Sequence, residues 1–234
     1  MSNEPVLRVV EPPGTVHGVA LVLHGGRSNG YGRVRSSQLA VLRMLPFARA
    51  LRAKGAADGL AVARLRYGAR GWNGAAQSPV ADARWTLEEL DRRYPGIPIG
   101  LVGHSMGGRT AMYVADHPNV SPVVGLAPWL EPGDPVRALS GRRVLIAHGS
   151  LDRMTSAGAS AEFAARAATV AASMSYVNVS DERHAMLRRA SVWHDLAAGF
   201  VTAVLFDRPP EGTADARTTN VLLKALAGEP SLVV

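Results

Sequence analysis

Residues 99–108 read IGLVGHSMGG and decide how the chain is expected to fold. The first four residues fit a short buried strand, and a plausible helix begins near the end of the stretch. Ser105 stands between them with glycines on both sides. A sharp strand-to-helix turn lifts a serine hydroxyl clear of a sheet, and it needs small residues where a Cβ would clash. The stretch therefore predicts an exposed, nucleophilic serine at the carboxyl end of a strand.

Short apolar segments alternate with longer helical ones along most of the chain. Strands are expected at residues 19–23, 60–65, 99–102, 123–126, 144–147 and 175–179, and helices at 38–54, 79–94, 107–117, 157–171 and 191–206. Pro46 should kink or interrupt the first helix. Short connections predict that consecutive strands are parallel neighbours with right-handed crossovers. The expected class is α/β, with a mostly parallel central sheet flanked by helices on both faces.

The pattern predicts one domain over residues 1–206, followed by a tail at residues 207–234. The sequence PPEG at residues 209–212 breaks the alternation of strands and helices. We expect the tail either to form one short helix, near residues 218–227, or to be partly disordered.

The composition argues against several classes of protein. The 234 residues include no cysteine, which leaves no disulfide, thiolate metal ligand or cysteine nucleophile. The longest strongly apolar run, residues 196–206, is shorter than the roughly 18 to 20 residues that span a bilayer. The first five residues lack the pattern of a secretion signal. We therefore expect a cytoplasmic protein with no membrane partner.

The chain is basic, with 26 Lys and Arg against 19 Asp and Glu and a net charge of +7. All but two of the basic residues are arginine, and they are scattered from end to end. The strongest clusters lie at residues 33–35, 142–143 and 188–189, and none is long enough for a continuous phosphate-binding track. We expect a solvated basic surface and no nucleic-acid partner. No metal-ligand spacing or phosphate loop is evident, so neither a metal nor an organic cofactor is expected.

A serine hydroxyl becomes a good nucleophile when a histidine, oriented by a carboxylate, removes its proton. His184 is the candidate base, because it follows the last expected core strand in a loop that can reach over the sheet edge. Asp152 is the candidate acid, in the loop after the strand at 144–147, and Asp134 is the alternative. The histidines at positions 24, 104 and 148 stand beside glycines at strand ends, where an imidazole more often braces a loop.

A developing oxyanion needs two hydrogen-bond donors. The backbone N–H of Met106, the residue after the candidate nucleophile, should provide one of them. The second should come from residues 24–27, HGGR, where we favour the N–H of Gly26 and keep Arg27 as the alternative. A second Gly-x-Ser-x-Gly match at residues 26–30 contains Ser28, but no helix follows it, so a polar loop serine is expected there.

The residues that would bind substrate are less clearly marked. Arg27, Trp72, Trp129 and Met186 are candidates for the pocket, since they are expected near strand ends on the side of the serine. Tryptophan and methionine at such positions are equally often ordinary core residues.

Taken together, these motifs resemble the α/β-hydrolase superfamily over roughly residues 5–206. The order Ser105, Asp152, His184 matches the nucleophile, acid and base of that superfamily. The resemblance implies hydrolysis of a carboxylic ester, or of a related small acyl compound, through an acyl-serine intermediate and without a cofactor. Residues 127–143 leave no room for a helical cap, so the chain is most similar to the compact dienelactone-hydrolase-like group. Those enzymes use cysteine where serine stands here, so their substrate is not implied.

Three other functions remain open at this stage. An acyltransferase would use the same three residues with an alcohol, amine or thiol as the acceptor. A peptidase that recognises a carboxylate could use Arg27, Arg70 and Arg153. A non-catalytic binding protein could retain the fold. The chain is expected to be a monomer or a homodimer.

Overall fold

The computed structural model describes residues 3–210, 212–213 and 215–234. Within these residues, one eight-stranded sheet has the order β1-β3-β2-β4-β5-β6-β7-β8. Only β1 runs antiparallel to its neighbour, and every other adjacent pair is parallel. The strands are β1 (Val6–Val10), β2 (Gly18–Leu23), β3 (Leu60–Arg66), β4 (Ile99–His104), β5 (Val120–Leu126), β6 (Arg143–Gly149), β7 (Ser173–Val179) and β8 (Ser231–Val233).

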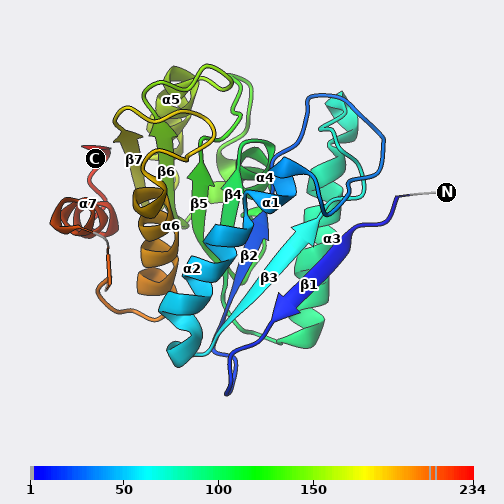
Figure 1. Cartoon of the computed structure of the whole chain (residues 1–234), viewed down its shortest axis with the longest axis horizontal. Helices are drawn as coiled ribbons and strands as arrows, with labels where there is room; N and C mark the ends of the chain where they lie inside the picture. Colours follow the sequence, from blue (N-terminus) through cyan, green and yellow to red (C-terminus); the bar gives the residue numbers. More distant parts are fainter. Residues whose placement is uncertain (1–2, 211, 214) are drawn as a thin grey trace.

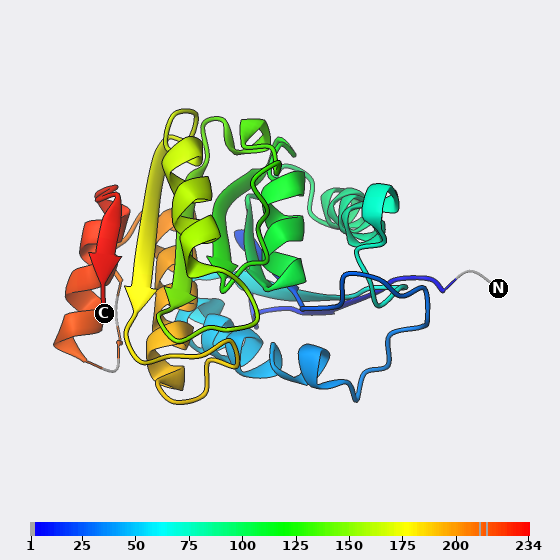
Figure 2. The same cartoon turned by 90° about the horizontal axis from the view of Figure 1, so that it is seen from above.

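Helices cover both faces of this sheet (Figures 1 and 2). One core lies between the sheet and α3, α4 and α5, and the other lies between the sheet and α2, α6 and α7. The helices are α1 (Leu39–Leu42), α2 (Leu45–Gly55), α3 (Ser78–Arg93), α4 (Met106–Val114), α5 (Ala157–Ala167), α6 (Ala190–Leu205) and α7 (Ala216–Leu226). The expected α/β class is therefore confirmed.

Period-two alternation explains how one strand serves both cores. In β2, Val19, Leu21 and Leu23 face the first core, whereas Ala20 and Val22 face the second. Because both faces are covered, the strand reads as a continuous apolar run, which made it visible in the sequence.

The structure corrects the expected connections. The chain passes from β3 to β4 across β2, so these two consecutive strands are not neighbours. The long helix α3 makes this crossover. The antiparallel edge strand β1 was not predicted, because Arg8 interrupts its apolar pattern. The predicted helix at 38–54 is interrupted, as expected, with α1 ending at Leu42 and Pro46 in the first turn of α2.

The segment after residue 206 was expected to form one short helix or to be partly disordered. The helix is present as α7, and the strand β8 was not predicted. Helix α7 packs in the second core, and β8 pairs with β7 in parallel. Leu232 and Val234 are buried there. The described part of the segment therefore belongs to the same domain, and the boundary expected at residue 206 does not separate it. Residues 211 and 214 lie outside the described part of the chain.

No helix among the described residues combines the length and the apolar character that a bilayer crossing would require.

Candidate active site

Ser105 lies at the tip of the turn between β4 and α4. Its backbone has φ 55° and ψ −119°, a conformation that L-residues rarely adopt. The Ser105 N–H donates to the carbonyl of Leu126 at 3.0 Å, which ties the turn to the end of β5. A Cβ on Gly103 would lie 2.2 Å from the carbonyl oxygen of Gly107, so only glycine fits beneath the turn. The strained turn expected from residues 99–108 is present.

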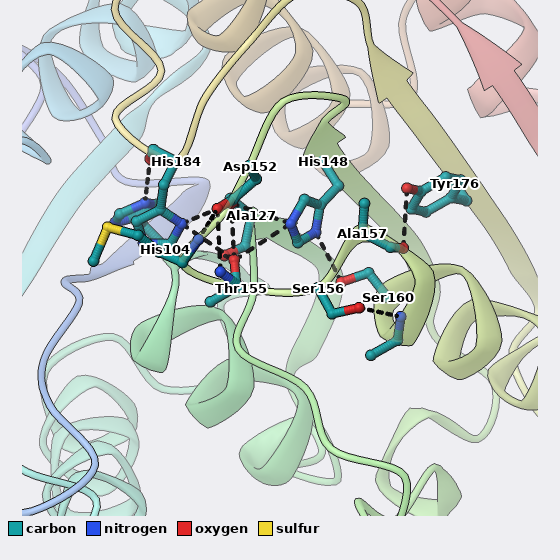
Figure 3. Close-up of polar contacts among 12 residues, drawn as sticks. His104, Ala127, His148, Asp152, Thr155, Ser156, Ala157, Ser160, Tyr176 and His184 are labelled. Carbon is teal, nitrogen blue, oxygen red and sulfur yellow. Dashed lines mark hydrogen bonds and ion pairs between the residues drawn. The ribbon is translucent and has the colours of Figure 1, made fainter.

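Asp152 and His184 come together at the carboxyl ends of β6 and β7 (Figure 3). His184 Nδ1 lies 2.8 Å from Asp152 Oδ2, and the Asp152 side chain is fully buried. A proton on Nδ1 satisfies this contact, and the other ring nitrogen, Nε2, is then left as a proton acceptor. The pair therefore has the tautomer that a general base requires.

The Asp152 carboxylate is held ionised by hydrogen bonds from four residues. Burial by itself would raise the pKa of this carboxyl, but hydrogen bonds from His148 and His184 and from the backbone of Met154 and Thr155 outweigh it. The net effect lowers the pKa of Asp152 far below its ordinary value. The Thr155 hydroxyl adds a bond of 2.8 Å to Oδ2. Asp152 is thus a fixed negative charge beneath the imidazole of His184.

A second buried histidine, His104, connects the loop of His184 to the serine turn. The His104 and His184 rings lie 4.7 Å apart, and His104 Nε2 donates to the His184 carbonyl at 3.1 Å. Burial lowers the pKa of His104 to about 3, so this ring is neutral at physiological pH. Since His104 directly precedes Ser105, the contact brings the candidate base to the turn. Among the described residues, no hydrogen bond joins Ser105 to His184, and such bonds often tighten only with substrate present.

Two backbone N–H groups belong to residues beside the turn of Ser105 and are candidates for the oxyanion donors. Those of Gly26 and Met106 donate to no other group in the part of the chain that the structure describes. A Cβ on Gly26 would lie 2.3 Å from the Met106 methyl carbon, so the two residues are in close contact. The alternative donor, the Arg27 N–H, is already bonded to the Arg70 carbonyl at 2.9 Å. The geometry favours Gly26 over Arg27 as the second donor.

His24 braces the loop that contains Gly26. Its Nδ1 lies 2.6 Å from the Gly25 carbonyl, and its Nε2 accepts from the Tyr67 N–H at 3.2 Å. Burial lowers the pKa of His24 to about 4, so the neutral ring donates at one nitrogen and accepts at the other. This is the bracing role expected for a histidine beside glycine at a strand end.

The remaining candidates for acid and nucleophile have other contacts. Asp134 is paired with Arg109 at 2.6 Å and accepts from the Tyr113 hydroxyl, so it does not meet His184. Glu182, another carboxylate in the loop of His184, is fully buried and accepts from Trp193 Nε1 at 2.7 Å. Ser28 lies in an exposed loop, where its carbonyl accepts from Asn73. That outcome matches the loop serine predicted there.

Of the four candidate pocket residues, two line one cavity, whose lining does not include Ser105 or His184. Trp72 and Trp129 lie edge to face at 6.3 Å, beside a cavity of about 430 Å³. The Trp129 N–H donates to the Ser105 carbonyl at 3.1 Å, which places this tryptophan next to the turn. Met186 is buried in the second core, so it does not offer a free pocket wall. Arg27 is exposed on the neighbouring loop.

Sequence reasoning missed two contributors to the site. Arg109 lies between the two tryptophans, with its guanidinium carbon 4.3 Å from the Trp72 ring and 4.7 Å from the Trp129 ring. His148 was expected only to brace a loop, yet its Nε2 lies 3.2 Å from Asp152 Oδ2. The spacing of four residues between His148 and Asp152 was the one signal for this contact. No group of three or more His, Cys, Asp or Glu side chains in the described ranges could hold a metal ion.

Comparisons with known proteins concern the fold and one part of the chain. Residues 55–143 match the family model described as serine aminopeptidase, S33. The match contains the turn of Ser105 and ends before Asp152 and His184. No curated protein matches the chain significantly.

Several solved structures share the fold at low sequence identity. Est1E from Butyrivibrio proteoclasticus, with ferulic acid bound, has a TM-score of 0.62 and 14% identity, covering 84% of this chain and 94% of its own. An α/β serine hydrolase homologue from Coxiella burnetii has a TM-score of 0.59 and 16% identity, covering 85% and 97%. XC6422 from Xanthomonas campestris, described as an α/β serine hydrolase without lid, has a TM-score of 0.60 and 15% identity, covering 89% and 91%.

The sheet order, the turn of Ser105 and these neighbours define the class as the α/β-hydrolase fold. The chain is a compact member of that class, because residues 127–142, between β5 and β6, contain a single short 3-10 turn and no cap.

Proposed function

We propose that the chain is a serine hydrolase that cleaves a carboxylic ester, or a related small acyl compound, through an acyl-serine intermediate. The observation that carries this proposal is the buried Asp152–His184 pair, joined at 2.8 Å and tied through His104 to the strained turn of Ser105. The family match and the serine hydrolases that share the fold support hydrolase activity in general.

The first half-reaction forms the acyl-serine. His184 Nε2 takes the proton of the Ser105 hydroxyl as the serine oxygen attacks the carbonyl carbon of the substrate. The negative charge that develops on the carbonyl oxygen is met by the N–H groups of Gly26 and Met106. Collapse of the tetrahedral intermediate expels the alcohol, which receives the proton from His184.

The second half-reaction releases the acid. His184 removes a proton from water, the resulting hydroxide attacks the acyl carbon, and the proton returns to Ser105 as the carboxylic acid leaves. Asp152 keeps the Nδ1 proton in place and stabilises the imidazolium that forms in each half-reaction. Because its own pKa is lowered, Asp152 stays ionised and does not take the proton.

A small acyl substrate is favoured by the absence of a cap between β5 and β6. The cavity beside Trp129 is a candidate place for the acyl or alcohol group, since two tryptophans border it. Ferulic acid, an aromatic acid, is bound by one structural neighbour, which makes aromatic esters a reasonable part of the first panel.

The test is labelling with a fluorophosphonate, followed by intact-mass measurement. An activated serine reacts quickly, so the wild-type chain should gain one adduct and Ser105→Ala should gain none. Ser28→Ala is the matched control, because it removes the serine of the other Gly-x-Ser-x-Gly match and should keep the adduct.

Turnover of an ester panel completes the test. Ser105→Ala and His184→Gln should each lower turnover by about 10⁴-fold or more. Product analysis with and without an added alcohol separates hydrolysis from acyl transfer. An adduct that survives Ser105→Ala, or most of the activity retained in either variant, would contradict the proposal.

A further inference from the structure

Two adjoining cavities lie at the β1 side of the sheet, where α2 no longer covers the strands. The first, of about 410 Å³, and the second, of about 570 Å³, share four lining residues. These are Arg8, Ser36, Ser37 and Arg66. β1 and β3 form the edge of the sheet at this place (Figure 1). The two cavities thus adjoin each other, and we call them together the edge groove.

The edge groove is lined by six arginines. They are Arg8, Arg33, Arg35, Arg64, Arg66 and Arg70. Three of them stand on one face of the sheet: Arg8 pairs directly with Arg64 across the antiparallel strands, and Arg66 follows two positions along β3. Like charges placed opposite each other across two strands are destabilising. The fold therefore holds an arrangement that costs stability.

No acidic side chain in the described part of the chain relieves this repulsion. Within the residues that the structure describes, none of the six arginines forms an ion pair, and no carboxylate lines either cavity. The repulsion is also visible in the pKa values. Burial, together with the charge of Arg8, lowers the pKa of both Arg64 and Arg66, and Arg33 contributes at Arg66. The guanidinium groups of Arg64 and Arg66 still remain charged at neutral pH.

The first cavity adds an apolar wall to these charges. Its side chains include Val22, Val41, Met44, Leu45 and Leu65. Leu42, at the end of α1, also lines this cavity and is 41% exposed. The edge groove therefore combines an apolar half with an arginine-rich half that also offers the hydroxyls of Ser36 and Ser37.

We propose that the edge groove binds a small, soluble, phosphorylated amphiphile, with its apolar group in the first cavity and its phosphates among the arginines. Phosphate matches the fork of donors on guanidinium, and a diphosphate offers enough negative charge to offset several arginines at once. A compact pocket fits a small molecule better than a nucleic acid. Of the described residues, none that lines either cavity is Phe, Tyr or Trp, so surfaces for base stacking are lacking.

The test is calorimetric titration with geranyl diphosphate, which has an apolar chain and a diphosphate and offers no carboxylic ester to Ser105. Pyrophosphate and geraniol, titrated separately, represent the two halves. We expect geranyl diphosphate to bind more tightly than either, and its affinity to fall as salt is added. Because no acyl chemistry is involved, the result is independent of whether the chain is a hydrolase.

Three variants locate the binding. Arg8→Gln should lower the affinity for geranyl diphosphate by about 10-fold to 100-fold, which is the loss expected for one charged hydrogen bond. The melting temperature of this variant should not fall. Leu42→Ser should lower the affinity for geranyl diphosphate but leave the affinity for pyrophosphate unchanged. Arg92→Gln on α3 is the matched control: it also removes one exposed arginine charge, and it should leave binding unchanged.

Several results would overturn the proposal. If geranyl diphosphate at millimolar concentration gave no heat of binding, the edge groove would not bind this class of ligand. If Arg8→Gln and the wild type bound it with equal affinity, the binding site would lie elsewhere. If pyrophosphate bound as tightly as geranyl diphosphate, the apolar half of the edge groove would contribute nothing to binding, and the proposed amphiphilic ligand would be wrong. Binding only to phosphatidic acid vesicles, or only to an oligonucleotide, would replace the small molecule with a membrane or a nucleic acid.

Discussion

Mild acid should destabilise the fold because two histidines are buried in their neutral form. Burial lowers the pKa of His24 from 6.5 to about 4 and the pKa of His104 from 6.5 to about 3. In the unfolded chain both rings regain their ordinary pKa. Below pH 6.5 the unfolded state therefore binds more protons than the folded state, and the free energy of unfolding falls as the pH falls. Above pH 7 neither histidine contributes to pH dependence.

The size of the effect follows from these pKa values. Between pH 7 and pH 5, protonation of each histidine in the unfolded state costs about 2 kcal/mol of stability, or about 4 kcal/mol for the pair. A typical domain is stable by only about 5 to 15 kcal/mol, so the loss is large. Asp152 does not contribute in this window. Its lowered pKa supplies stability that is lost only as the pH approaches the ordinary aspartate value of about 3.9 and falls below it.

Urea unfolding, followed by tryptophan fluorescence at pH 7 and pH 5 and constant ionic strength, measures this difference. In His104→Gln, the amide can replace the donor to the His184 carbonyl, and about half of the pH dependence should disappear. A wild-type difference below about 1 kcal/mol would refute the reasoning. So would a His104→Gln variant with the full pH dependence of the wild type.

Three further predictions concern single positions. Gly26→Ala should lower kcat/KM for an ester by about 10²- to 10³-fold, because its Cβ would lie 2.6 Å from the Arg70 carbonyl oxygen and would shift the Gly26 backbone and its N–H. Gly32→Ala, with its nearest atom at 3.7 Å, should have little effect in the same steady-state assay. His148→Leu removes a donor from buried Asp152 and should lower kcat by about 10-fold with little change in KM; an unchanged kcat would mean that this contact does not orient the acid. Leu232→Ala should cost about 2 to 4 kcal/mol in urea unfolding, while the exposed neighbour Val233→Ala should change stability by less than about 0.5 kcal/mol, and equal losses would argue that β8 does not pack as described.

Much of the fold was visible in the sequence because its central strands are buried on both faces. Such strands give continuous apolar runs, and glycine or proline ends most of them. The two edge strands were missed for physical reasons. β1 carries Arg8 in the middle of its run, and β8 has only three residues, too few for any periodicity. The position of β4 on the far side of β2 was also unpredictable, since strand order depends on packing rather than on connection length.

The candidate site was partly predictable because its key residues follow strand ends. The carboxyl ends of parallel strands meet at one edge of the sheet, so the order Ser105, Asp152, His184 already indicated proximity. The contacts that support them were not predictable. Glu182 lies two residues before His184 in the same loop, and its carboxylate is buried against Trp193 Nε1 on the following helix. Only the packing of that helix defines such a contact.

The two ends of the sheet also bear on how the chain avoids unwanted assembly. An exposed strand edge is a template on which another chain can add a strand and begin aggregation. Here one edge, β8, is three residues long, and the other, β1, has an arginine at its centre and prolines at positions 5, 12 and 13 around it. Proline lacks an N–H to donate, and a charge on the edge opposes stacking of identical chains. The arginine that costs stability within the fold therefore also discourages growth of the sheet from one molecule into the next.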